Sequence, residues 1–193
     1  MIRLPAYILA GGRSRRFGSD KARALLRDRP MILHVADAAS AVASRITVVA
    51  DRAGKYDDLG LRTVSDLHGG LGPLAGLHAA LRDLKPGEAW LLLCPCDAPG
   101  LRPEWLQRLL PREDDPCDVV ALCDERPEPL PAVFSIRCLP EVERRLQGNQ
   151  RSLHGLLETL RVREASCPEL RSRIWQVNTP QELERLRDTD HAD

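Results

Sequence analysis

The sequence predicts an α/β fold: a single domain in which helices flank a mostly parallel β-sheet. Segments with strand patterns alternate with segments of helical spacing, without an internal repeat or a low-complexity linker. Residues 90–94 form a continuous apolar run, which is typical of a strand buried on both faces of a parallel sheet. The length of 193 residues fits one domain.

The first third of the chain predicts three strands. The first strand is expected at residues 5–9 and leads into a loop of glycines and basic residues. The Ala-rich segment 30–43 has apolar residues at helical spacing and predicts a helix. The β-branched segment 45–50 predicts the second strand, the polar segment 51–58 a short helix, and residues 61–64 the third strand.

The rest of the chain continues the alternation. Residues 74–84 predict a helix that ends at Lys85-Pro86-Gly87, and the apolar run at 90–94 follows. The quartet Thr179-Pro180-Gln181-Glu182 is a capping box with proline at the first helical position, so a final helix should run to about Arg187. The same patterns predict helices at 103–110, 137–146 and 152–160, and strands at 118–123, 131–136 and 174–177.

Composition excludes several classes of function. Lys+Arg and Asp+Glu are both 28, which gives a formal net charge of +0, and aromatic residues make up 4%. A nucleic-acid binder usually has a basic excess or aromatic stacking platforms, so no nucleic-acid partner is expected. The six cysteines form no C-x-x-C pair, and no apolar leader or membrane-spanning run is present. We therefore expect a cytoplasmic protein with reduced thiols and no membrane partner.

The stretch from Leu9 to Lys21 predicts an anion-binding loop. An apolar strand runs into the adjacent glycines Gly11 and Gly12, followed by three arginines and a lysine. Glycines let the backbone approach a ligand closely, and exposed backbone N–H groups together with basic side chains attract phosphate. The spacing matches neither a Walker A loop nor G-x-G-x-x-G. An ordinary turn followed by a solvated basic face is the alternative interpretation.

Two aspartates follow predicted strands and should lie at the same edge of the sheet as this loop. Asp66 follows the third strand, and Asp97 follows the strand at 90–94. Parallel α/β sheets bind ligands at the carboxyl ends of their strands, although a lone aspartate there also serves as a cap or turn residue. Mg²⁺ takes one or two carboxylates plus water and phosphate oxygens, which makes Asp97 the candidate metal ligand. Lys21 and Arg16 are suited to neutralising a triphosphate as it is cleaved.

Four segments, in this order, resemble the signature of the molybdenum cofactor guanylyltransferases, the MobA family of the nucleotidyltransferase superfamily. They span nearly the whole chain. They are Leu9-Ala10-Gly11-Gly12-x-Ser14-x-Arg16-x-Gly18-x-Asp20-Lys21, Gly72-Pro73-Leu74-Ala75-Gly76, Cys94-Pro95-Cys96-Asp97 and Val177-Asn178-Thr179-Pro180-x-Glu182-Leu183.

The resemblance implies a Rossmann-like nucleotidyltransferase fold in one domain, residues 1–193. About residues 1–100 would bind the nucleotide and about 101–193 the acceptor. It implies transfer of GMP from GTP to molybdenum-bearing molybdopterin, which yields the molybdopterin guanine dinucleotide cofactor and releases pyrophosphate, with Mg²⁺ as cofactor. The implied partners are GTP, molybdenum-molybdopterin, and recipient molybdoenzymes or their chaperones.

The resemblance also implies roles for individual residues. Lys21 and Arg16 would act on the triphosphate, and Asp97 would be catalytic and bind Mg²⁺. Pro131 and Asn178 would lie on the acceptor side. The nucleotide would contact Leu9, Ala10, Gly11, Gly12, Lys21, Asp66 and Asp97. The chain departs from the family at Val49, where an asparagine often contacts the nucleotide, so that role falls to no residue or moves to Asp51.

Two other functions remain open from the sequence. The first is a related nucleotidyltransferase that uses CTP or another phosphorylated acceptor. Sister cytidylyltransferases typically have Ala-Ala-Gly where this chain has Ala10-Gly11-Gly12, which favours guanine. The second is a non-catalytic carrier of nucleotide or cofactor, against which the presence of both Lys21 and Asp97 argues.

Overall fold

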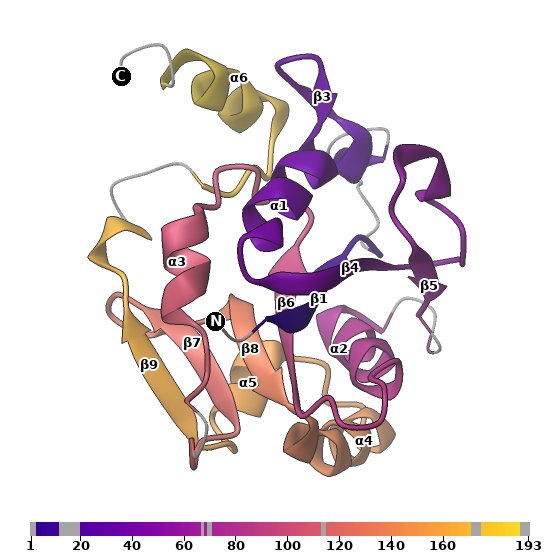
Figure 1. The fold of residues 1–193 in the computed structure, drawn as a ribbon, viewed down its shortest axis with the longest axis vertical. Coiled ribbons are helices and arrows are strands. Elements are labelled where there is room, and N and C mark those ends of the chain that lie inside the picture. Colours follow the sequence, from indigo (N-terminus) through magenta and orange to yellow (C-terminus); the bar gives the residue numbers. More distant parts are fainter. Residues whose placement is uncertain are drawn as a thin grey trace.

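The computed structural model describes residues 3–11, 20–66, 68, 71–112, 115–170 and 175–189. These residues form one seven-stranded sheet, with strand order β5-β4-β1-β6-β8-β7-β9, and helices on both of its faces (Figure 1). The predicted α/β class and the mostly parallel sheet are confirmed. The strands are β1 (Leu4–Leu9), β4 (Ala43–Ala50), β5 (Thr63–Ser65), β6 (Trp90–Pro95), β7 (Val119–Cys123), β8 (Pro127–Ser135) and β9 (Val162–Ser166).

The sheet changes its direction of growth between β1 and β6. From β1 the chain adds β4 and β5 outward on one side, and it then returns past β1 to form β6 on the other side. Leu9 lies level with Val49 on one neighbour and Pro95 on the other, so these three strands end at the same height. In open α/β sheets such a switch point, at the carboxyl ends of the strands, is where ligands bind.

Strand β8 is antiparallel to both of its neighbours, β6 and β7, whereas β9 is parallel to β7. The helices are α1 (Met31–Ser40), α2 (Pro73–Arg82), α3 (Pro103–Arg108), α4 (Leu139–Gln147), α5 (Leu153–Leu157) and α6 (Pro180–Thr189). No helix in the described ranges has the length and apolar character needed to cross a membrane.

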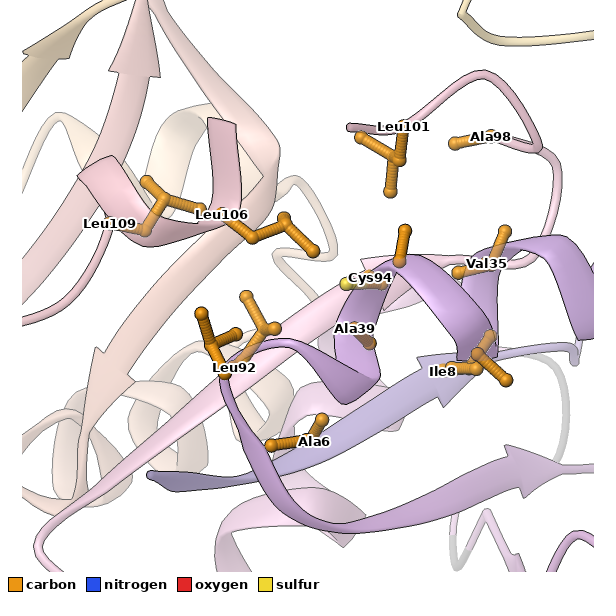
Figure 2. Packing of buried hydrophobic residues seen from close by; sticks show 14 of the residues in the cluster. Ala6, Ile8, Val35, Ala39, Leu92, Cys94, Ala98, Leu101, Leu106 and Leu109 are labelled. Atoms are coloured by element: carbon orange, nitrogen blue, oxygen red, sulfur yellow. The ribbon is translucent and has the colours of Figure 1, made fainter. Parts of the chain in front are cut away.

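Alternating side chains of the central strands fill two separate cores. Figure 2 shows Ala6 and Ile8 of β1 and Leu92 and Cys94 of β6 in one cluster with residues of α1 and α3. Their neighbour Leu93 belongs instead to a cluster that includes residues of α2, α4 and α5. Burial on both faces explains why residues 90–94 carry no polar alternation.

A third, smaller cluster joins distant parts of the chain. The hairpin of β2 (Leu25–Leu26) and β3 (Arg29–Pro30) lies beside α6 (Figure 1). Leu26 and Met31 are buried there with Val177, Leu183 and Leu186. The beginning of α6 has the predicted capping box: Thr179 Oγ1 accepts from the Glu182 backbone N–H at 3.2 Å, and Glu182 Oε2 accepts from the Thr179 N–H at 3.0 Å.

Two predictions of secondary structure are corrected, and one strand of the seven-stranded sheet was missed. Residues 175–177, the described part of the predicted strand 174–177, form no strand, because their backbone bonds to the loop after β6 and not to a strand. Strand β9 was not predicted, since Val162-Arg163-Glu164-Ala165-Ser166 is largely polar, as an edge strand can be. Residues 51–56 form bends and turns, and only the last two residues of the predicted helix 51–58 are helical, in the short 3₁₀ helix η2 (Asp57–Leu59).

Candidate active site

A cavity of about 380 Å³ lies at the switch point of the sheet. Its walls come from the ends of β1, β4, β5 and β6, from the beginning of α2, and from segments near residues 21, 130 and 176. The lining residues are Leu9, Ala10, Gly11, Asp20, Lys21, Ala22, Val49, Asp66, Gly72, Pro73, Gly76, Pro95, Cys96, Asp97, Leu130 and Gln176. The strand ends predicted to carry chemistry therefore meet in one place.

Lys21 and Asp97 form the charged pair of this cavity. Lys21 begins the 3₁₀ turn η1 (Lys21–Arg23), and Asp97 follows β6. The Lys21 Nζ donates to Asp97 Oδ2 at 2.7 Å, with 14% and 19% of the two side chains exposed. This degree of burial weakens screening by water, so the attraction between the two charges is stronger than that of an exposed pair.

A segment close to the C-terminal helix lies against Asp97. The Val177 N–H donates to the Asp97 carbonyl at 2.7 Å, and the Gly100 N–H donates to the Trp175 carbonyl at 3.1 Å. Gln176 Nε2 consequently reaches Asp97 Oδ1 at 3.1 Å, and Asn178 Oδ1 accepts from Lys21 Nζ at 3.2 Å. Both oxygens of the Asp97 carboxylate are thus held.

Asp66 lies on another wall of the same cavity. Its backbone N–H donates to the Ala50 carbonyl at 2.7 Å, which extends the β5 pairing by one residue. Its Oδ1 accepts from the backbone N–H of His68 at 2.9 Å, so the turn role considered for this aspartate is also real. Val49 lines the cavity with an apolar side chain, whereas Asp51 binds Lys55 at 2.8 Å and is not a lining residue.

The donor set suits Mg²⁺ bound together with a nucleotide. Asp97 places a carboxylate at the cavity wall, and Mg²⁺ can complete its octahedron with water and phosphate oxygens where a protein offers one or two carboxylates. Within the described residues no three His, Cys, Asp or Glu side chains are grouped to enclose a metal by themselves. A metal held by Asp97 would therefore depend on the substrate for further ligands.

The described cysteine and histidine side chains add no nucleophile or base to the cavity. Burial raises the pKa of both the Cys94 and Cys96 thiols to about 12, which keeps them protonated and unreactive. Both pack against the core of α1 and α3, as alternation along the strand predicts. Among the described residues no histidine lines the cavity.

A second hollow, of about 690 Å³, lies at the beginnings of β7 and β9. Two of its lining arginines are paired with aspartates: Arg161 donates to Asp118 at 2.9 and 3.0 Å, and Arg163 donates to Asp115 at 2.8 Å. Its lining includes none of the described residues that were predicted to act on a substrate. The smaller cavity is therefore the candidate active site.

Most of the predicted site residues come together. Leu9, Ala10, Gly11, Lys21, Asp66 and Asp97 line the cavity, and Asn178 contacts Lys21 at 3.2 Å. Pro131 lies in β8 next to Leu130, which lines the cavity where Pro131 does not. Gly12 and Arg16 fall outside the described residues.

Sequence reasoning assigned no role to several lining residues. Asp20 and Gln176 belong to this group, and so do Gly72, Pro73 and Gly76 at the beginning of α2. The glycine-proline pair at the beginning of α2 was a usable signal, because Gly72 has φ +84°, a conformation that glycine adopts without strain. Gln176 gave no local signal, since its position depends on backbone pairing with a loop 79 residues away.

Comparisons with known proteins agree with this geometry. The sequence profile described as "MobA-like NTP transferase domain" matches residues 6–165. The chain is 35% identical to a molybdenum cofactor guanylyltransferase of Desulfosudis oleivorans, over 96% of this chain and 95% of the relative. It is 40% identical to a probable molybdenum cofactor guanylyltransferase of Methanothermobacter thermautotrophicus, over 79% and 82%. The crystal structure of molybdopterin-guanine dinucleotide biosynthesis protein A from Archaeoglobus fulgidus superposes with a TM-score of 0.80 at 27% identity, covering 98% of this chain and 100% of that one.

Proposed function

The chain belongs to the MobA-like NTP transferase family, and we propose that it transfers GMP from GTP to the terminal phosphate of molybdenum-bearing molybdopterin. The product is the molybdopterin guanine dinucleotide cofactor. The observation that carries the proposal is the Lys21–Asp97 pair, at 2.7 Å, in a cavity at the switch point of the sheet. The full-length similarity to guanylyltransferases supplies the identity of the nucleotide and the acceptor.

The reaction exchanges one phosphate bond for another. An oxygen of the molybdopterin phosphate attacks the α-phosphorus of GTP, and the bond between that phosphorus and the α–β bridging oxygen breaks. The electron pair leaves with pyrophosphate. Because the attacking oxygen is already an anion, the step needs no general base, which agrees with a cavity whose described lining contains no histidine.

The work of the protein is therefore positioning and charge stabilisation. Lys21 binds the triphosphate and stabilises the charge that develops on the leaving pyrophosphate. Asp97 would hold Mg²⁺, which supplies further neutralisation of the phosphate oxygens when bound. Leu9, Ala10 and Gly11 offer backbone groups at the end of β1, and Asp66 offers a carboxylate to the nucleoside.

The acceptor side of the same proposal includes Asn178, Pro131 and the segment before it. Supporting this is the contact of Asn178 with Lys21, which brings the C-terminal segment to the phosphate-binding side chain. Leu130 supplies an apolar wall beside Pro131. The recipient would be a molybdoenzyme or its chaperone, and the free state of all six cysteines is consistent with a cytoplasmic setting.

The test is turnover of the purified chain with molybdenum-molybdopterin and a single nucleotide. We expect pyrophosphate release and guanine dinucleotide formation with GTP, and much slower turnover with CTP or ATP. Preference for CTP would identify the chain as the cytidine-specific type. Binding of GTP without pyrophosphate release would identify a carrier and overturn the enzymatic proposal.

A further inference from the structure

The connection between β4 and β5 packs against the turn that carries Lys21. The hydroxyl of Tyr56 donates to the Asp20 carboxylate, with oxygen distances of 2.9 and 3.1 Å, and the Lys55 Nζ lies 3.4 Å from the same carboxylate. Arg23, at the end of the turn, donates to both oxygens of Asp58 at 2.7 and 2.8 Å. Residues 55–58 therefore bind the turn at both of its ends.

Tyr56 is well suited to act as the fixed part of this contact. Its side chain is fully buried, and its backbone N–H donates to Thr63 Oγ1 at 3.0 Å, which ties it to β5. Burial, followed by the hydrogen bond to Asp20, raises the pKa of Tyr56, so its hydroxyl remains a donor at all ordinary pH values. The phenol is thereby a rigid donor directed at a single carboxylate.

Asp20 connects the fixed hydroxyl of Tyr56 to the turn that begins with Lys21. It is the N-cap residue of the turn η1, and its Oδ1 accepts from the Ala22 N–H at 3.1 Å. Lys21 follows Asp20 directly in the chain. Holding Asp20 in place therefore restricts the backbone position from which the Lys21 side chain extends toward Asp97. Asp20 also lines the cavity, where an unrestrained carboxylate would compete for the Lys21 ammonium and repel a phosphate.

We propose that Tyr56 is a positioning residue for the reaction, which acts through Asp20 to hold Lys21 at the phosphate-binding wall of the cavity. The inference rests on the proposed role of Lys21 in GMP transfer. The connection between β4 and β5 contributes no lining residue to the cavity. The proposal gives this connection a part in the chemistry through Tyr56.

The test compares Tyr56→Phe with the matched variant Tyr7→Phe. Tyr7 is also fully buried and donates its hydroxyl to an aspartate, Asp83 Oδ2 at 2.9 Å, but neither Tyr7 nor Asp83 lines the cavity. Both variants should lose stability in urea unfolding, and Tyr7→Phe at least as much as Tyr56→Phe, because the Tyr7 hydroxyl also accepts from Arg45 Nη2 at 3.0 Å. Only Tyr56→Phe should lower kcat for GMP transfer, by about fivefold to tenfold, while the KM for molybdopterin stays within about twofold. Equal effects of the two variants on kcat would overturn the proposal.

A double-mutant cycle separates positioning from general loosening of the fold. With Lys21→Ala already present, Tyr56→Phe should change kcat by less than about twofold, since the side chain that it positions is gone. A further fivefold loss in that background would overturn the proposal.

The same cycle, measured by GTP binding in calorimetric titration, needs no acceptor. If the wild-type chain makes no guanine dinucleotide, the proposed function fails. The positioning role is then decided by whether Tyr56→Phe weakens GTP binding only when Lys21 is present, and equal weakening in both backgrounds would refute it.

Discussion

Gly76 lies on the cavity side of α2. Adding one methyl group there should affect GTP binding and the free energy of unfolding in ways that can be measured separately. A Cβ built on Gly76 would lie 2.6 Å from Leu9 Cδ2, closer than carbon atoms can pack, with Leu9 Cδ1 and Cγ at 3.5 and 3.6 Å. Both residues line the cavity. In Gly76→Ala the Leu9 side chain must therefore turn away from α2, and the wall between β1 and α2 changes shape.

Two opposing contributions to stability have similar size. Replacing glycine by alanine inside a helix favours the folded state by about 1 kcal/mol. Overpacking by one methyl group costs about 1–3 kcal/mol, toward the low end where the neighbour is the flexible end of a leucine. The net loss in the free energy of unfolding should thus be about 0–2 kcal/mol. The loss of GTP affinity has no compensating gain, and a fivefold to tenfold increase in Kd corresponds to about 1–1.4 kcal/mol.

Urea unfolding and calorimetric titration with GTP measure the two quantities separately. The matched control is Gly155→Ala in α5, which does not line the cavity. The atom nearest to the added Cβ there is Arg145 Nη1 at 3.3 Å, the end of a buried side chain that must shift by a few tenths of an ångström. The control should bind GTP as the wild type does. Normal GTP affinity in a folded Gly76→Ala variant would refute the assignment of this wall to the nucleotide.

Three further predictions concern charged groups. Lys21→Ala should lower turnover about 100-fold or more, as loss of one preorganised charge-stabilising group does, and an unchanged rate of pyrophosphate release would exclude a phosphate role. Asp97→Ala should lower kcat far more than it weakens GTP binding; near-normal kcat would show that Asp97 is not the metal ligand. Burial raises the pKa of Asp115, but hydrogen bonds from Cys117 and Arg163 outweigh this effect and lower the pKa to about 2. Asp115 therefore stabilises the fold above its unfolded pKa of about 3.9, and this contribution is lost as pH falls toward 2. In urea unfolding, the free energy of unfolding of Asp115→Asn should consequently fall less between pH 4 and pH 2 than that of the wild type. Equal decreases in the two proteins would contradict this prediction.

The sequence predicted those parts of the fold where local pattern and tertiary environment agree. The apolar run at 90–94 and the β-branched segment at 45–50 are strands because they lie in the middle of the sheet, where both faces are buried. Residues 162–166 were missed because an edge strand with one buried residue, Ala165, has no apolar pattern to detect. Residues 175–177 look like a strand but bond to a loop, and a sequence does not indicate which backbone will be the partner.

The candidate site likewise has a part that the sequence predicted and a part that it did not. Asp66 and Asp97 could be placed at one edge because the carboxyl ends of parallel strands meet there, and the structure brings both to the cavity. The pairing of Tyr56 with Asp20 joins residues 36 positions apart through a turn that was predicted as a helix. No spacing rule covers such a contact, so side-chain partners that depend on loop conformation had to be found in the structure.

The third hydrophobic cluster explains how groups so far apart in the chain keep a common geometry. Leu26 and Met31 follow the turn that carries Lys21, while Val177 and Leu183 flank Asn178. Lys21 and Asn178, whose side chains are in contact at 3.2 Å, are thus both close in sequence to residues of one buried cluster. The Val177 N–H also donates to the Asp97 carbonyl at 2.7 Å. Because close packing transmits displacements of this kind, a cavity made in this cluster should disturb both the proposed nucleotide side and the proposed acceptor side of the site. Helix α6 therefore supports the candidate site through packing, although none of its described side chains lines the cavity.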